Sequence, residues 1–173
     1  MPLPTKLRNV YYYRIAGKYI FAGDLFITRD KLYFFPEVDL EEQRAEIANK
    51  FSFHHFSIDY LRFAAEIVIY ISQKFGSYTS STHFWKPNIT NEQFQFQATQ
   101  CVEEKKAAKR SDKSGKLLPA PTVVTAKEVS NLKLGLTGVL SFSAQSDTHD
   151  FKIGPRRKRS VRDALWEAGF GKV

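Results

Sequence analysis

Apolar and polar side chains alternate along residues 10–36 with the two-residue period of a β-strand. Short turn-like sequences interrupt the alternation at residues 16–17 and 29–31. Aromatic and β-branched residues, which suit a half-buried sheet surface, fill the segments between these turns. The pattern predicts three antiparallel strands, over residues 10–15, 19–28 and 32–36.

Two capping-box spacings mark predicted helix starts in the middle of the chain. Asp39 is followed three residues later by Glu42, and Thr90 has a Gln at the same interval. Apolar residues then recur at helical spacing, so we expect a helix of about three turns from Asp39 and another from Thr90. The apolar face of the second helix would consist of Phe94, Ala98, Cys101, Val102 and Ala108. Residues 94–98 also alternate as in a strand, but we favour the helix.

A further helix is predicted over residues 57–75, because apolar residues recur there at helical spacing and Gly76 is a natural helix stop. Aromatic and aliphatic residues also occupy most of its opposite side and leave only a narrow polar stripe. We therefore expect this helix to be buried on most sides. It would be either the central helix of an insertion or a contact surface for a second copy of the chain or for a membrane.

Residues 109–116 are rich in charge and are followed by Pro119 and Pro121, which predicts a flexible loop. Strand patterns return beyond this loop, with turns at 135–138 and 145–148, over residues 122–125, 129–134, 139–144 and 149–153. A terminal helix follows, with capping-box spacing between Ser160 and Asp163 and a stop at Gly169. Its apolar face would consist of Val161, Ala164, Leu165 and Ala168.

A meander of strands, a helical stretch, a second meander and a terminal helix together predict an α+β fold. Within the first meander, residues 23–36, GDLFITRDKLYFFP, resemble the G-x-L-x-I-T-x-x-x-L-x-F hairpin of the GRAM and pleckstrin-homology-like superfamily. The strands of residues 128–153 and the helix with Leu165 and Trp166 are similar to the last strands and C-terminal helix of that superfamily. The resemblance implies a bent antiparallel β-barrel or sandwich that the C-terminal helix plugs at one end.

On this basis we expect a single pleckstrin-homology-like domain. Its core would comprise residues 8–38 and 119–171, interrupted by a helical insertion over residues 39–118. The insertion is far longer than the usual connection in such domains, and long loops often carry a protein's particular function.

The resemblance also implies a noncatalytic recognition module, typically for phosphoinositides, other membrane lipids or proteins at membranes. In many such domains, basic residues around the first hairpin bind the lipid headgroup. Here Arg14 and Lys18 flank Gly17 in the first hairpin and are the candidate headgroup ligands. Lys31 is a weaker candidate for the same site.

The net charge of +8 is concentrated in two clusters. The first lies between Lys152 and Arg162 and contributes +6 without any acid. The members expected to bind an anion are Arg156, Arg157, Lys158, Arg159 and Arg162. The second cluster contributes +5 after Asp112 is subtracted, and its cations are Lys105, Lys106, Lys109, Arg110, Lys113 and Lys116. The rest of the chain carries −3, so the positive charge is local.

Cations at the start of the terminal helix oppose the helix macrodipole, so their placement favours a role other than helix stability. A lipid phosphate, a nucleic-acid backbone or an acidic protein face would each offset this cost, with backbone N–H groups adding to the site. Near an anionic membrane each Lys or Arg contributes about 1 kcal/mol, in a salt-sensitive way. We favour an anionic membrane surface, phosphoinositides included, or an acidic protein partner. The alternative is that these cations bind no ligand and simply form a solvated loop and helix face.

Nucleic acid is the less favoured partner. It would need exposed aromatic side chains beside the basic clusters, and the candidates are Tyr11, Tyr12, Phe84 and Trp85. Aromatic residues in strands are more often part of a core, and neither an RRM signature nor a helix-turn-helix is evident.

Sequence signatures of enzymes and metal sites are absent from the chain. It has no P-loop, no dinucleotide-binding glycine motif, no nucleophile elbow and no zinc pattern. His54 and His55 are adjacent and make a poor metal pair. His83 and His149 have no carboxylate at ligand spacing. We expect no enzymatic activity, no cofactor and no metal.

The single cysteine, Cys101, cannot form an intramolecular disulfide and is expected to be an inert buried thiol. The N-terminal residues contain no apolar stretch of signal-peptide length, and the most apolar window, residues 58–71, contains three charged residues. We therefore expect a cytoplasmic location, with peripheral attachment at the inner face of a membrane.

Overall fold

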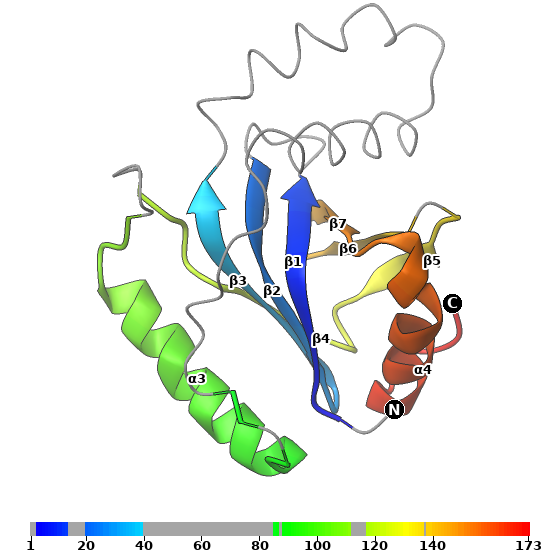
Figure 1. Cartoon of the computed structure of the whole chain (residues 1–173), viewed down its shortest axis with the longest axis horizontal. Coiled ribbons are helices and arrows are strands. Elements are labelled where there is room, and N and C mark those ends of the chain that lie inside the picture. The colour runs from blue at the N-terminus through cyan, green and yellow to red at the C-terminus, as the bar shows by residue number, and fades with distance from the viewer. Residues whose placement is uncertain (1–2, 14–19, 40–84, 87, 112–116, 137) are drawn as a thin grey trace, which may run out of the picture.

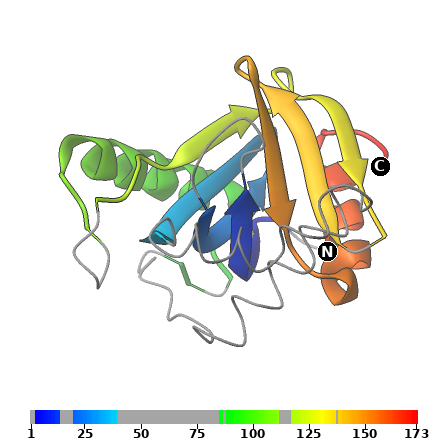
Figure 2. The same ribbon diagram turned by 90° about the horizontal axis from the view of Figure 1, so that it is seen from above.

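A computed structural model describes residues 3–13, 20–39, 85–86, 88–111, 117–136 and 138–173. In these residues seven strands form one antiparallel sheet in the order β4-β3-β2-β1-β7-β6-β5. The strands are β1 (Thr5–Tyr13), β2 (Ile20–Thr28), β3 (Lys31–Asp39), β4 (Thr122–Thr125), β5 (Ser130–Leu134), β6 (Val139–Ala144) and β7 (Asp147–Lys152). The sheet curves without closing, so β4 and β5 are its two edges (Figure 1, Figure 2). With a helix on each face, the fold is α+β, as the sequence predicts.

The first three strands form the centre of the sheet. Side chains alternate along each strand, so Leu25 joins the core on the concave face and Phe26 joins a second core on the convex face. The β2–β3 register shifts at a bulge next to Gly23. A Cβ at Gly23 would lie 2.3 Å from the carbonyl oxygen of Phe35, so only glycine allows this close approach of the two strands.

The concave face holds the larger core and the C-terminal helix α4 (Lys158–Ala168), which follows a 3₁₀ turn, η3 (Pro155–Arg157). The buried residues of α4 are those that its periodicity predicts, Val161, Ala164, Leu165 and Ala168. The helix ends at Gly169, whose φ of 92° is the left-handed conformation that favours glycine. The backbone N–H of Asp30, in the β2–β3 turn, donates to the carbonyl of Ala168 at 2.8 Å. Helix α4 therefore plugs the end of the concave face where the β2–β3 turn lies.

The convex face is covered by α3 (Asn91–Ala107), on the opposite side of the sheet from α4 (Figure 1). The predicted capping box at its start is confirmed. The hydroxyl of Thr90 accepts from the Gln93 backbone N–H at 3.2 Å, and the Gln93 side chain accepts from the Thr90 N–H at 3.0 Å. The residues that form this core are Phe94, Ala98 and Val102 of α3 with Phe26, Tyr33 and Phe35 of the sheet. Cys101 is half-buried and Ala108 is exposed, so the apolar face is narrower than predicted.

Edge strand β4 has three of its outward-facing backbone groups bonded to the β6–β7 turn and to the segment that follows β4. The side-chain amide of Gln145 donates to the carbonyl of Val123 at 3.3 Å. The Thr125 N–H donates to the Glu128 carboxylate, and the Thr125 carbonyl accepts from the Glu128 N–H, both at 3.1 Å. These contacts cover part of the open side of β4.

Several strand boundaries differ from the predictions; β3, for example, extends to Asp39, three residues beyond its predicted end at Pro36. Strand β1 begins at Thr5 rather than at Val10, because a bulge between Leu7 and Val10 breaks the alternation of side chains. Strand β7 begins at Asp147 rather than at His149, because the β6–β7 turn uses only two residues, both with positive φ.

Of two further predicted helix caps, the one at Ser160 is wrong, and the one at Asp39 adjoins residues that the structure does not describe. Asp39 is the last residue of β3. Helix α4 begins at Lys158, ahead of Ser160, and has no side-chain cap. The rest of the helix predicted from Asp39, and the helix predicted over residues 57–75, lie outside the residues that the structure describes.

Candidate anion-binding surface on the C-terminal helix

The chain between β7 and α4 is fixed against the β5–β6 turn. The backbone N–H groups of Ile153 and Gly154 both donate to the Gly138 carbonyl, at 2.9 and 3.2 Å. Gly138 has a φ of 79°, and a Cβ there would lie 2.2 Å from the Gly154 carbonyl carbon. This tight crossing sets the direction in which η3 and α4 leave the sheet.

Arg157, a member of the first cluster, braces this junction. Its Nε donates to the Ile153 carbonyl at 2.7 Å, and its Nη1 donates to the Arg8 carbonyl at 2.6 Å. The guanidinium thus ties the bulged part of β1 to the start of η3. Since these donors are used within the protein, Arg157 has less capacity for an external anion than its exposed neighbours.

The other cations of the first cluster remain accessible. Arg156, Arg159 and Arg162 are exposed and Lys158 is half-buried. Within the described part of the chain, none of these four side chains forms an ion pair. Lys152, by contrast, is half-buried on β7, and burial lowers the pKa of its ammonium group. The accessible positive surface is therefore formed by η3 and the first two turns of α4.

Trp166 lies next to these cations and is 65% exposed. It follows Arg159 and Arg162 at intervals of seven and four residues, which places the three side chains on one flank of the helix. Arg162, Trp166 and Lys172 line a shallow hollow of about 270 Å³, to which Asp163 also contributes. Asp163 stands four residues after Arg159 and three before Trp166, so its carboxylate borders the same flank, and Glu167 follows Asp163 by one turn. The exposed side of α4 therefore combines cations and an exposed indole with a neighbouring carboxylate.

The N-terminus of α4 contributes fewer free donors than predicted. The backbone N–H groups of Arg157 and Lys158 already donate to the carbonyls of Gly154 and Pro155 inside the 3₁₀ turn. No acidic residue stands in the first turn, where Lys158 and Arg159 oppose the macrodipole. An anion at this surface would therefore be bound by the basic side chains rather than by backbone N–H groups at the end of the helix.

The second basic cluster does not form one surface in the described residues. The Lys105 ammonium lies 3.5 Å from the Glu37 carboxylate and 5.2 Å from the centre of the Phe35 ring, with only 16% of its side chain exposed. Lys106 and Lys109 are exposed on the last turn of α3 and just beyond it. Helices α3 and α4 flank opposite sides of the sheet, so the two clusters are not combined (Figure 1). Lys113 and Lys116 lie outside the described residues.

Arg110 has a structural position that the sequence did not indicate. Its two terminal nitrogens donate to the carbonyl of Pro36 at 3.3 Å and to the carbonyl of Pro119 at 2.8 Å. Burial lowers the pKa of its guanidinium, and nearby Glu37 opposes that shift. Residues 111 and 117 also form a β-bridge, so both ends of the predicted flexible loop are anchored.

Of the residues suggested for headgroup binding in the first hairpin, Arg14 and Lys18 lie outside the described part of the chain. Lys31 is described, and it begins β3 as a partly exposed residue. The described residues of this hairpin therefore do not define a site for a lipid headgroup.

The strand tyrosines suggested as stacking platforms for nucleic acid are not exposed. Tyr11 and Tyr12 are only 9% and 6% exposed and belong to the core, as aromatic residues in strands more often do. Trp85 packs against Phe26 and Phe94 of the convex core, at ring distances of 5.7 and 5.6 Å. Phe84 falls in a part of the chain that the structure does not describe.

His149 and Cys101 have structural surroundings. His149 is buried, and its Nδ1 lies 2.8 Å from the Tyr12 hydroxyl, with which it forms a hydrogen bond. Burial raises the pKa of the Cys101 thiol, and the nearby Lys105 opposes that shift. Across the described ranges, no three His, Cys, Asp or Glu side chains are placed to hold a metal ion. His54, His55 and His83 are not among the described residues.

Sequence reasoning missed the exposure of Trp166 beside the basic cluster. Leu165 and Ala168 lie on the buried face, so helical periodicity alone turns Trp166 away from the core. The spacing of the buried residues in the sequence is therefore the signal that predicts an exposed Trp166.

Comparisons of the chain with protein-family models, curated proteins and solved structures find no match. Among the helices that the structure describes, none combines the length and apolar character needed to cross a membrane.

Proposed function

We propose that the protein is a noncatalytic recognition module of the pleckstrin-homology-like kind, which attaches to anionic membrane surfaces through one flank of α4. The order of elements supports the first part of this proposal. A meander of three strands, a long insertion, a second meander and a terminal helix against the concave face correspond to what the sequence resemblance implies. The sheet is open between β4 and β5, where the resemblance implied a barrel or sandwich.

The observation that carries the membrane proposal is the pairing of accessible cations with an exposed indole on one helix flank. Arg156, Lys158, Arg159 and Arg162 together contribute about 4 kcal/mol near an anionic surface, at about 1 kcal/mol each. Trp166 adds an amphipathic ring of the kind enriched at the level of lipid headgroups. Because the attraction is electrostatic, we expect it to weaken as salt rises.

An acidic protein face is the second candidate for the same surface, because its carboxylates would attract the same cations. We favour the membrane because the side chains form a row along an exposed helix with only a shallow hollow beside them. Such a surface suits a broad anionic surface better than it suits a single protruding protein segment. Nucleic acid fits less well, because Trp166 supplies a single stacking ring beside these cations, and Tyr11 and Tyr12 are buried.

Co-sedimentation with liposomes at physiological salt tests the proposal. Three compositions are compared: phosphatidylcholine alone, phosphatidylcholine with phosphatidylserine, and phosphatidylcholine with a phosphoinositide. The variants are Trp166→Ala and a triple variant, Arg156→Ala/Arg159→Ala/Arg162→Ala, which leaves the Arg157 brace intact. A matched control, Lys109→Ala/Lys127→Ala/Lys133→Ala, removes the same charge from exposed positions elsewhere.

We expect binding to both anionic liposomes, lost in the triple variant, weakened in Trp166→Ala and retained in the matched control. Equal loss in the triple variant and the control would contradict a role for this flank. Absence of binding to every liposome would overturn the membrane proposal and leave the acidic protein partner.

A further inference from the structure

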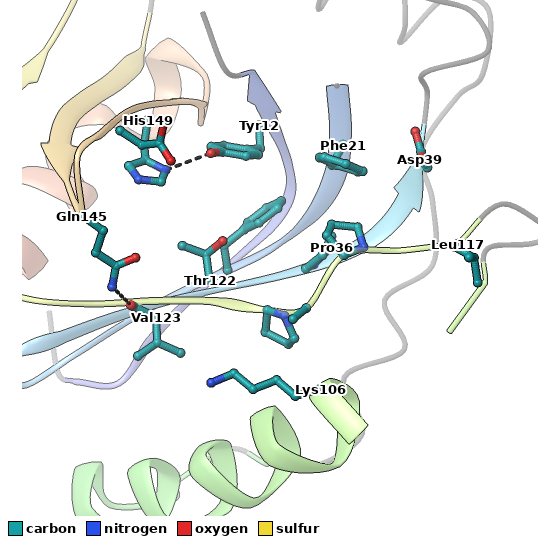
Figure 3. A pocket seen from close by; sticks show the side chains of 15 residues that line it. Tyr12, Phe21, Pro36, Asp39, Lys106, Leu117, Thr122, Val123, Gln145 and His149 are labelled. Carbon is teal, nitrogen blue, oxygen red and sulfur yellow. Dashed lines mark hydrogen bonds between the residues drawn. The ribbon is translucent and has the colours of Figure 1, made fainter. Parts of the chain in front are cut away.

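Polar groups around a cavity of about 710 Å³, lined by residues of β1, β4 and β7, are bonded within the protein (Figure 3). The Tyr12 hydroxyl forms a hydrogen bond of 2.8 Å with Nδ1 of His149. The side-chain amide of Gln145 donates to the Val123 carbonyl at 3.3 Å. These groups are therefore engaged before any ligand arrives. The shallow hollow on the exposed side of α4 differs in this respect.

The hollow on α4 has a volume of about 270 Å³ and is lined by Arg162, Asp163 and Trp166 of the helix and by Lys172 of the C-terminal segment. All four side chains are exposed. Within the part of the chain that the structure describes, none of them forms a hydrogen bond or an ion pair. Two cations, one carboxylate and one indole are therefore available to a ligand.

The C-terminal segment holds Lys172 beside the helix. After the left-handed turn at Gly169, the Phe170 N–H donates to the Leu165 carbonyl at 3.0 Å. Phe170 and Val173 are partly buried against the concave core, while Lys172 between them is exposed. Because the residues on both sides are anchored, the backbone of Lys172 does not have to be ordered by a ligand.

The Asp163 carboxylate is unfavourable on a surface that binds only anions, because it repels a phosphate and cancels part of the attraction of its neighbours. It forms no ion pair with Arg159 or Arg162, so pairing within the helix does not account for it. A hollow with two cations and one carboxylate instead matches a ligand that carries two anionic groups and one ammonium group.

We infer that this hollow binds the headgroup of phosphatidylserine, an inference that rests on the proposed attachment of α4 to anionic membranes. This headgroup carries a phosphodiester, a carboxylate and an ammonium group. Arg162 and Lys172 pair with its two anionic groups, and Asp163 accepts hydrogen bonds from its ammonium group. The Trp166 ring lies at the level of the headgroups. Phosphatidylglycerol has the same net charge but no ammonium group, and phosphoinositides add phosphates without one.

Co-sedimentation at physiological salt tests the inference on the full chain. The liposomes contain phosphatidylcholine with either phosphatidylserine or phosphatidylglycerol at equal mole fraction. Since the two lipids have the same net charge, the ratio of the two affinities separates headgroup recognition from attraction to the surface potential. A third set contains a phosphoinositide at a mole fraction that gives the same surface charge. Calorimetric titration with soluble glycerophosphoserine distinguishes the lipid from a free headgroup.

Two pairs of variants isolate the hollow. Asp163→Asn removes its carboxylate, and the matched control, Glu167→Gln, removes the same charge from an exposed position of α4 that does not line the hollow. Each of these two variants should strengthen binding to phosphatidylglycerol by about fivefold, because each raises the net charge by one. Lys172→Ala removes a cation from the hollow, with Lys133→Ala at an exposed position outside it as its control.

We expect wild-type protein to bind phosphatidylserine about threefold more tightly than phosphatidylglycerol, the gain from one added exposed ion pair. This ratio should fall to about one in Asp163→Asn and stay unchanged in Glu167→Gln. Lys172→Ala should weaken binding to phosphatidylserine more than Lys133→Ala does. Soluble glycerophosphoserine should bind about tenfold more weakly than the liposomes, because it does not engage the other cations of α4.

The outcomes separate this inference from the membrane proposal. Equal affinity for the two lipids, or a preference that Asp163→Asn retains, would overturn the headgroup assignment and leave attachment to anionic membranes in place. Tighter binding to the phosphoinositide liposomes would do the same. Binding of soluble glycerophosphoserine more tightly than the liposomes would assign the hollow to a free ligand instead of a lipid. Absence of binding to every anionic liposome would overturn the proposed function and this inference together.

Discussion

The guanidinium of Arg157 donates a hydrogen bond to the backbone carbonyl of Arg8 at 2.6 Å, across 149 positions of sequence. It joins the bulged start of the first strand to the turn before the last helix, and a second bond to the Ile153 carbonyl fixes its orientation. A basic residue in a cluster that attracts anions is therefore also part of the framework that holds the cluster in place.

The Arg157 brace predicts unequal stability effects in two adjacent arginines. Arg157→Ala removes both bonds to backbone carbonyls, so the free energy of unfolding should fall by about 1.5–3 kcal/mol. Arg156→Ala, at an exposed side chain, should change it by less than about 0.5 kcal/mol. Urea unfolding followed by circular dichroism gives both values. Equal effects of the two substitutions would contradict a structural role for Arg157.

The capping box of α3 predicts a graded effect at Thr90. Thr90→Ala removes the acceptor for the Gln93 N–H and should lower the free energy of unfolding by about 1 kcal/mol. Thr90→Ser keeps a hydroxyl in place and should restore most of that loss. Thermal and urea unfolding of the three proteins measure the series. A serine variant as unstable as the alanine variant would show that the methyl group, and not the cap, carries the effect.

The C-terminus of α4 predicts a cost for a side chain at Gly169. Its φ of 92° is left-handed, and a Cβ there would lie 3.1 Å from the Asp30 carboxylate. Gly169→Ala should therefore lower the free energy of unfolding by about 1 kcal/mol. Gly171 also has a positive φ but has open space around it, so Gly171→Ala separates backbone strain from contact with Asp30. A larger loss at Gly171 than at Gly169 would contradict the contribution of that contact.

The Cys101 thiol is expected to react slowly with alkylating and disulfide reagents. Burial raises its pKa, so at pH 8 a smaller fraction is thiolate than in an ordinary cysteine, and the thiolate is the reactive form. The rate should continue to rise with pH above the range in which an exposed thiol is already ionised. Reaction with 5,5′-dithiobis(2-nitrobenzoate) from pH 7 to 10, compared with the same chain in guanidinium chloride, measures this difference. A native rate equal to the denatured rate across the range would be incompatible with a protected thiol.

Local sequence patterns predicted those parts of the fold that depend on neighbouring residues. The Thr90 capping box and the buried face of α4 follow from residues a few positions apart, and both are confirmed. The start of β1 was missed because its bulge breaks the two-residue period. The predicted cap at Ser160 was wrong because the 3₁₀ turn starts the helical path earlier.

The candidate sites depend on contacts between distant segments, which periodicity does not report. The cations of α4 were found from charge alone, but the bond from Arg157 to Arg8 has no local signature. In the same way, Tyr12 meets Phe34 and His149 only after the strands pair. The two bonds of Arg110 likewise require Pro36 and Pro119 to be neighbours.

The contacts along β4 also bear on how copies of the protein behave at high concentration. An unclosed sheet offers its edge strands as templates for further strands, which is a route to fibrous aggregates. At β4, the Val123 carbonyl and both backbone groups of Thr125 are already bonded to Gln145 and Glu128. To pair along the whole of β4, an incoming strand would have to displace a side-chain amide, a carboxylate and a turn. Two polar side chains thus work against edge-to-edge polymerisation at an edge that the fold leaves open.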